Sequence, residues 1–184
     1  MDVRWNSTYL MLKHLVPYKN VFSVFINSHY GSQLLTTNYW YFAEKLLEFL
    51  ELFYDSTVIL FGVYYLTSPL VLHYILEIAS HLHACERDQN LRAIVAPMKL
   101  KFLKYWENIP LLYSYAFILD PRAKMRGFHR ILQLLAESTG TQYNSYYADV
   151  KTELYKSFNK YERKFGAARS QRITQPSNHI GKRK

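Results

Sequence analysis

The sequence predicts a mainly α-helical chain of about six to seven helices with little or no sheet. In several segments, apolar residues recur at three- and four-residue spacing, which places them on one face of a helix. Between these segments stand residues that typically start or stop helices, such as Ser68-Pro69 and Gly140. The chain has 184 residues, of which 49% are hydrophobic, so it is long enough to form one domain with a hydrophobic core.

The clearest helix is predicted to begin at a cap at Thr36, Thr37 or Asn38 and to run to Phe61. Its apolar residues share one face, and four acidic residues take the opposite face: Glu44, Glu48, Glu51 and Asp55. Before it, another helix is expected to begin at Asn6 or Ser7, either of which can cap it, and to be interrupted at Pro17. Gly31-Ser32 then marks a loop.

Further helices are predicted at residues 68–82, 90–106 with a kink at Pro97, 111–119, 124–138 and 143–165. The apolar run 111–119 is short enough to be a buried strand instead, but helix is favoured because its neighbours are helical. The pattern divides the chain into a helical region, residues 1–165, and a basic disordered tail, residues 166–184, which contains no acidic residue.

Residues 56–76 contain no Asp, Glu, Lys or Arg and are about as long as a bilayer span. Gly62 and Ser68-Pro69 interrupt this stretch. Two buried helices are therefore predicted there instead of a membrane-spanning helix, and no membrane partner is expected.

Charge is unevenly distributed along the chain, whose formal net charge is +9. Residues 1–86 carry four Lys or Arg against seven acidic residues, whereas residues 87–184 carry nineteen against seven. A basic half of this kind is typical of a protein that binds nucleic acid, although a solvated basic surface and tail would show the same pattern. The single cysteine, Cys85, excludes an internal disulfide and suits a reducing compartment.

Motifs in a fixed order connect the chain to a known family. They are Arg4-Trp5-Asn6-Ser7-Thr8, then Phe53-Tyr54-Asp55-Ser56-Thr57 with Leu66-Thr67-Ser68-Pro69, and then residues 98–106 (MKLKFLKYW) with Leu119-Asp120-Pro121-Arg122. Over residues 2–164 the chain resembles the plant hAT-type transposases, in particular the Ricesleeper-like proteins that carry a BED zinc finger. The second motif departs from the family's usual Ser-Gly and Tyr-Pro-Thr.

The resemblance implies an RNase H-like core interrupted by a large helical insertion, and this chain is expected to be mainly that insertion. The BED finger and first core strands would lie upstream, and the dimerisation region with the last catalytic carboxylate downstream. We expect a nuclear, DNA-binding relic of a transposase that needs no cofactor. It should be catalytically inactive, because no complete carboxylate triad for metal binding is found. The alternative is a helical structural or protein-interaction module without DNA affinity. A second copy and full-length hAT relatives are further candidate partners.

Eight residues are candidates for contacting DNA: Arg4, Trp5, Lys99, Lys101, Lys104, Lys124, Arg126 and Arg130. The resemblance places the Arg-Trp motif near the DNA end, where a Trp ring can stack on an unpaired base and an Arg can hold phosphate. The other six, with Tyr105 and Trp106 between them, form the best basic-aromatic patch of the sequence. Alternatively, Trp5 anchors the first helix, the aromatic residues belong to the core and the lysines are solvated.

Two other groups of polar residues have simpler interpretations. His81, His83 and Cys85 are badly spaced for zinc, because only His81 and Cys85 would share a helix face, so no metal site is predicted. Asp120 is expected to cap the helix that follows Pro121. If the helices normally dock on a core, they should also expose an apolar patch.

Overall fold

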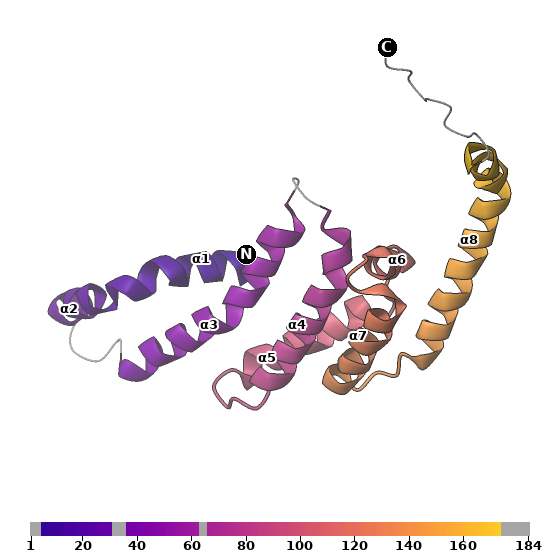
Figure 1. Ribbon diagram of the computed structural model, residues 1–184. Helices are drawn as coiled ribbons and strands as arrows, with labels where there is room; N and C mark the ends of the chain where they lie inside the picture. The colour runs from indigo at the N-terminus through magenta and orange to yellow at the C-terminus, as the bar shows by residue number, and fades with distance from the viewer. Residues whose placement is uncertain (1–4, 31–35, 63–65, 174–184) are drawn as a thin grey trace, which may run out of the picture. The chain divides into compact units, whose positions relative to one another are not determined.

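The computed structural model describes residues 5–30, 36–62 and 66–173, with side chains as far as Gly166 (Figure 1). This part of the chain contains no strand, which confirms the mainly α prediction. Its α-helices are α1 (Trp5–Leu15), α2 (Lys19–Tyr30), α3 (Thr37–Leu60), α4 (Val71–Cys85), α5 (Arg92–Trp106), α6 (Leu111–Leu119), α7 (Lys124–Thr139) and α8 (Asn144–Ile173). Two 3-10 turns complete it, η1 (Val16–Tyr18) and η2 (Ser68–Leu70).

Helix boundaries follow the breakers in the sequence. Pro17 lies in η1, which joins α1 to α2 without an intervening loop. Gly140 ends α7 in the left-handed conformation with φ of 75°, which glycine adopts without steric cost. The run 111–119 forms helix α6, which confirms the prediction of a helix instead of a buried strand. Asn6 and Ser7 lie inside α1, so their prediction as caps is wrong, because the helix already includes Trp5.

The uncharged stretch around Gly62 is not one helix. Helix α3 ends at Leu60, and the chain resumes its helical course at η2 and α4. In the described part of the chain, no helix combines the length and apolar character needed to cross a bilayer.

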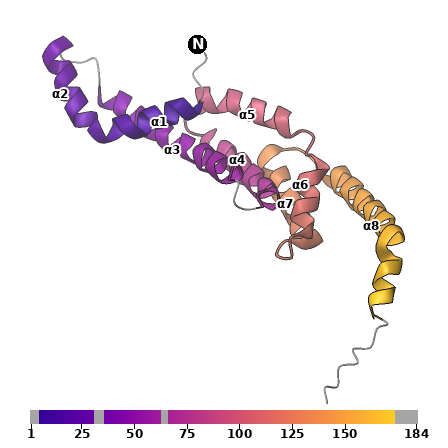
Figure 2. The ribbon, with the colours of Figure 1, turned by 90° about the horizontal axis from the view of Figure 1, so that it is seen from above.

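The chain divides after Gln142 into two compact units. In the first, α1 packs along α3, α3 contacts α4, and α4 also packs against α5 and α7 (Figures 1 and 2). One buried cluster joins α1, α3, α4 and α5 through Tyr9, Phe49, Leu50, Leu82, Leu91 and Val95. On α7, the buried face consists of Phe128, Ile131, Leu132 and Leu135. Helix α4 is therefore the centre of the unit, because three neighbouring helices bury apolar side chains against it.

Helix α2 is attached to α3 by polar contacts and buries none of its residues. Lys19 Nζ lies 2.6 Å from Glu44 Oε1, and the Trp40 indole donates a hydrogen bond of 2.9 Å to Ser23 Oγ. Its exposed side includes Val21, Phe22, Val24 and Phe25. This surface is the exposed apolar patch that the sequence leads us to expect.

The second unit is described by α8, a helix of 30 residues that runs to Ile173. The helix therefore extends past its predicted end near Phe165, into the segment predicted as a basic tail. Gly166 does not stop the helix, because it is followed by Ala167, Ala168 and Arg169, which favour helix. Residues 174–184, with the basic Lys182-Arg183-Lys184, lie outside the described part.

Candidate nucleic-acid interface

The three predicted lysines of α5 do not share one face. Because an α-helix turns about 100° per residue, Lys101 and Lys104 lie about 60° apart, with Lys99 on roughly the opposite side. Lys101 and Lys104 are exposed. Lys99 is only 20% exposed, and its Nζ lies 2.5 Å from Glu86 Oε2. This hydrogen bond lowers the pKa of the Glu86 carboxyl, and it links α5 to the end of α4.

Around Lys101 and Lys104, the exposed surface of α5 is partly apolar. Leu100 and Tyr105 are 71% and 74% exposed, whereas Trp106 packs edge-on against Tyr113 at 6.3 Å between ring centroids. We call Leu100, Lys101, Lys104 and Tyr105 the α5 face. It is smaller than the predicted basic-aromatic patch, because Lys99 and Trp106 are used in packing within the unit.

The basic residues of α7 form a second, separate group. Lys124, Arg126 and Arg130 are exposed and form no ion pair with any described residue. Arg126 and Arg130 are one turn apart, on the side opposite the buried Phe128. Helices α5 and α7 both contact α4 and lie on different sides of it (Figure 2), so the six predicted residues belong to two surfaces and not to one patch.

At the N-terminus, Trp5 is partly buried and Arg4 lies outside the described residues. The Trp5 ring lies 6.0 Å from the Phe53 ring, tilted by 57°, and the side chain is 36% exposed. This contact supports the interpretation of Trp5 as an anchor of α1 on α3. The remaining exposed part of Trp5 is accessible to a ligand.

Asp120 organises the turn before α7 but does not cap the helix with its side chain. Its carboxylate accepts hydrogen bonds from the Arg122 backbone N–H at 2.9 Å and from Arg122 Nη2 at 2.6 Å. These bonds from Arg122 lower the pKa of Asp120 to about 2. The first residue of α7, Lys124, instead donates its backbone N–H to the Asp120 carbonyl, 3.1 Å away. The predicted cap is therefore corrected to a turn held by Asp120.

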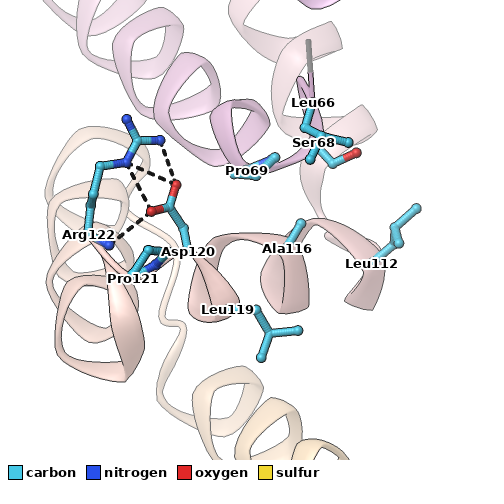
Figure 3. A pocket seen from close by; sticks show the side chains of 9 residues that line it. All are labelled: Leu66, Ser68, Pro69, Leu112, Ala116, Leu119, Asp120, Pro121 and Arg122. Carbon is cyan, nitrogen blue, oxygen red and sulfur yellow. Dashed lines mark hydrogen bonds and ion pairs between the residues drawn. The ribbon is translucent and has the colours of Figure 1, made fainter. Parts of the chain in front are cut away.

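An open pocket of about 620 Å³ lies beside this turn (Figure 3). Leu112, Ala116 and Leu119 line it along α6, and the paired Asp120 and Arg122 lie at one end. The lining is mostly apolar, and the only charged side chains in it neutralise each other. It offers no unpaired cation to a phosphate.

His81 and Cys85 belong to the packing between α3 and α4. His81 Nε2 lies 3.0 Å from the Phe49 carbonyl oxygen, and the His81 ring stacks on Phe49 at 5.2 Å. Burial raises the pKa of the Cys85 thiol, which disfavours the thiolate. Within the described residues, no three His, Cys, Asp or Glu side chains are grouped so that they could hold a metal ion.

The sequence reasoning missed the surface of α8. The sequence places Val150, Leu154, Phe158 and Tyr161 on one apolar face of this helix. Val150 is fully buried, but Phe158 and Tyr161 are 60% and 67% exposed. The signal that could have indicated exposure was the concentration of charge on the rest of this helix: Lys151, Glu153, Lys156, Lys160, Glu162, Arg163 and Lys164.

Comparison with known proteins defines the class first. Residues 69–161 match the family model described as hAT-like transposase, RNase-H fold, which is half of the chain. The chain belongs to this family. The matched segment contains every candidate on α5 and α7 but not Trp5. Although the family is named for the RNase-H fold, the described residues of this segment form helices joined by turns and contain no strand.

Individual relatives agree with this assignment. The chain is 28% identical over 161 residues to zinc finger BED domain-containing protein RICESLEEPER 2 of Oryza sativa subsp. japonica, covering 86% of this chain and 22% of the relative. It is 30% identical over 129 residues to RICESLEEPER 1 of the same plant, covering 68% and 18%. It is 31% identical over 141 residues to a putative AC transposase of Zea mays, covering 70% and 18%. The chain thus spans about a fifth of the length of these relatives, and no solved structure matches it.

Proposed function

We propose that this chain is a transposase-derived helical region that binds DNA through phosphate contacts without catalysing strand transfer. It corresponds to the helical insertion of a longer RNase H-like protein and acts in the nucleus. Membership of the hAT family and the basic second half of the sequence support this function.

The α5 face is the observation that carries the proposal. Lys101 and Lys104 are exposed, lie within the matched segment and form no ion pair with any described residue. An unpaired ammonium group can replace counterions on the DNA backbone, which gives affinity that depends on salt and not on base sequence. The exposed Tyr105 ring beside them can add contact with a sugar or an unpaired base.

The contacts of several acidic side chains support an inactive region. Strand transfer by two metal ions needs carboxylates that converge beside a phosphate. Glu44 and Glu48 are paired with Lys19 and Lys45, and Asp120 is paired with Arg122. We therefore expect the purified chain to leave supercoiled and linear DNA intact with Mg²⁺ or Mn²⁺, and metal-dependent cleavage would contradict this part of the proposal.

A series of single lysine variants on one helix tests the DNA-binding surface. For Lys101→Ala and Lys104→Ala, the slope of log K against log salt should fall by about 0.9 each, the value for one lost phosphate contact on duplex DNA. Lys99→Ala is the matched control, because it removes the same charge from the same helix but from a side chain already paired with Glu86. Its slope should equal that of the wild type. The measurement is fluorescence anisotropy with a labelled duplex over a range of salt concentrations.

The exposed apolar side of α2 favours the second candidate function, a helical module that contacts only protein. The same titration separates the two. Absence of DNA affinity at low salt would reject DNA binding and leave the protein-interaction module.

A further inference from the structure

Helix α8 has two different faces beyond residue 153. Leu154, Phe158, Tyr161 and Phe165 follow one another at intervals of four, three and four residues, so they form one stripe, which we call the α8 seam. Phe158, Tyr161 and Phe165 are exposed, and the rings of Tyr161 and Phe165 lie 4.6 Å apart. Lys156, Lys160 and Arg163 form a basic stripe on the opposite side of the helix. The seam is thus the less polar side of this helix.

We propose that the α8 seam binds the α8 seam of a second copy of this chain, with the two helices antiparallel. The spacing is that of the a and d positions of a coiled coil, with Phe158 and Phe165 at a, and Leu154 and Tyr161 at d. In an antiparallel pair, a positions face d positions. Phe158 of one copy then meets Tyr161 of the other, and Leu154 meets Phe165, so every layer combines two apolar side chains.

The residues beside the seam fit this antiparallel register. Tyr155 and Glu162 follow the d positions, and in this register Tyr155 of one copy lies beside Glu162 of the other, where its hydroxyl can donate to the carboxylate. Ser157 and Lys164 precede the a positions, and Ser157 of one copy lies beside Lys164 of the other. No like charges face each other across the seam. In a parallel pair, each seam residue would face the same residue of the other copy. Lys151 lies at an a position one turn before Leu154, so it would face a second Lys151.

The distribution of charge favours a second copy over a nucleic acid as the occupant of the seam. The basic stripe lies on the far side of each helix, so pairing through the seam keeps the two stripes apart and leaves them exposed. A phosphate backbone would be drawn to that stripe and not to the aromatic side. The seam from Leu154 to Phe165 is only about 18 Å long, so the dimer should be weak and depend on concentration.

Sedimentation equilibrium of the full chain over a concentration series tests the seam directly. The wild type should show a reversible monomer–dimer equilibrium without DNA. The Phe158→Ser/Tyr161→Ser variant should associate at least about tenfold more weakly, because the two layers that pair Phe158 with Tyr161 lose their rings. Both side chains are exposed, so the helical circular dichroism should stay unchanged. Lys156→Ser/Lys160→Ser is the matched control on the opposite face, and it should dimerise at least as well as the wild type.

Disulfide trapping tests the register in a Cys85→Ser background. Tyr155→Cys/Glu162→Cys should form intermolecular disulfides under mild oxidation, whereas Tyr155→Cys alone should not, because the two Tyr155 positions lie about 13 Å apart along the antiparallel axis. A wild type that stays monomeric at every concentration would overturn the proposal. So would a dimer that the Phe158→Ser/Tyr161→Ser variant retains, or association that appears only when DNA or an acidic helical peptide is added. Self-association through α8 is independent of DNA binding, so each can fail without the other.

Discussion

Phe128→Ala should lower the free energy of unfolding of the first unit by about 3–5 kcal/mol, the usual cost of removing a fully buried ring. Phe128 is completely buried on α7, the helix that packs along α4. Its removal leaves a cavity on the buried face of α7. A change of this size is a large fraction of the stability of an ordinary domain. Urea denaturation followed by far-UV circular dichroism measures it.

Leu100→Ala is the control for this loss. It also shortens an apolar side chain, but Leu100 is largely exposed on α5, so the free energy of unfolding should change by less than about 0.5 kcal/mol. Equal effects of the two variants would mean that α7 does not pack on α4 as described.

Tyr9→Ala should release α1, and with it α2, from the rest of the first unit. Tyr9 is the buried residue that α1 contributes to the main cluster, and its ring stacks on Tyr54 at 4.6 Å. Truncation should cost about 3–5 kcal/mol of local stability. Helix α2 buries none of its residues, and it contacts α3 through the Lys19–Glu44 ion pair and the hydrogen bond from Trp40 to Ser23. These contacts are too weak to hold α1 in place. Hydrogen exchange read by mass spectrometry should show faster exchange in residues 5–30 than in the wild type.

Met11→Ala provides the comparison on the same helix, because Met11 is exposed. Its exchange pattern should match that of the wild type. If Tyr9→Ala instead accelerated exchange equally in α4 and α7, α1 would be part of one cooperative unit with them and not a separately attached helix.

Most helices could be predicted because local chemistry fixes them. Pro17 removes a backbone donor and Gly140 adopts a left-handed conformation, so the breaks at these positions do not depend on distant contacts. The sequence predicts the end of α8 too early, because the apolar periodicity fades at Phe165. Periodicity reports which face is buried, whereas a helix can continue through Gly166 on the propensity of the residues that follow.

The candidate interface was harder to predict because it depends on partners distant in the sequence. Lys99, Lys101 and Lys104 look alike in the sequence, and only the position of Glu86 at the end of α4 separates the first from the other two. Trp106 likewise looks available until α6 brings Tyr113 against it. The helical period alone could have indicated that Lys99 lies apart from Lys101 and Lys104.

Lysine acetylation with and without a DNA duplex, read by mass spectrometry at low salt, tests the central claim most directly. If DNA lies on the α5 face, it should reduce modification of Lys101 and Lys104 several-fold, while Lys19 and Lys45 in the acidic half of the chain should react as before. Unchanged reactivity of Lys101 and Lys104 in a sample where DNA is bound, or equal protection of all four lysines, would contradict the assignment of DNA binding to this face.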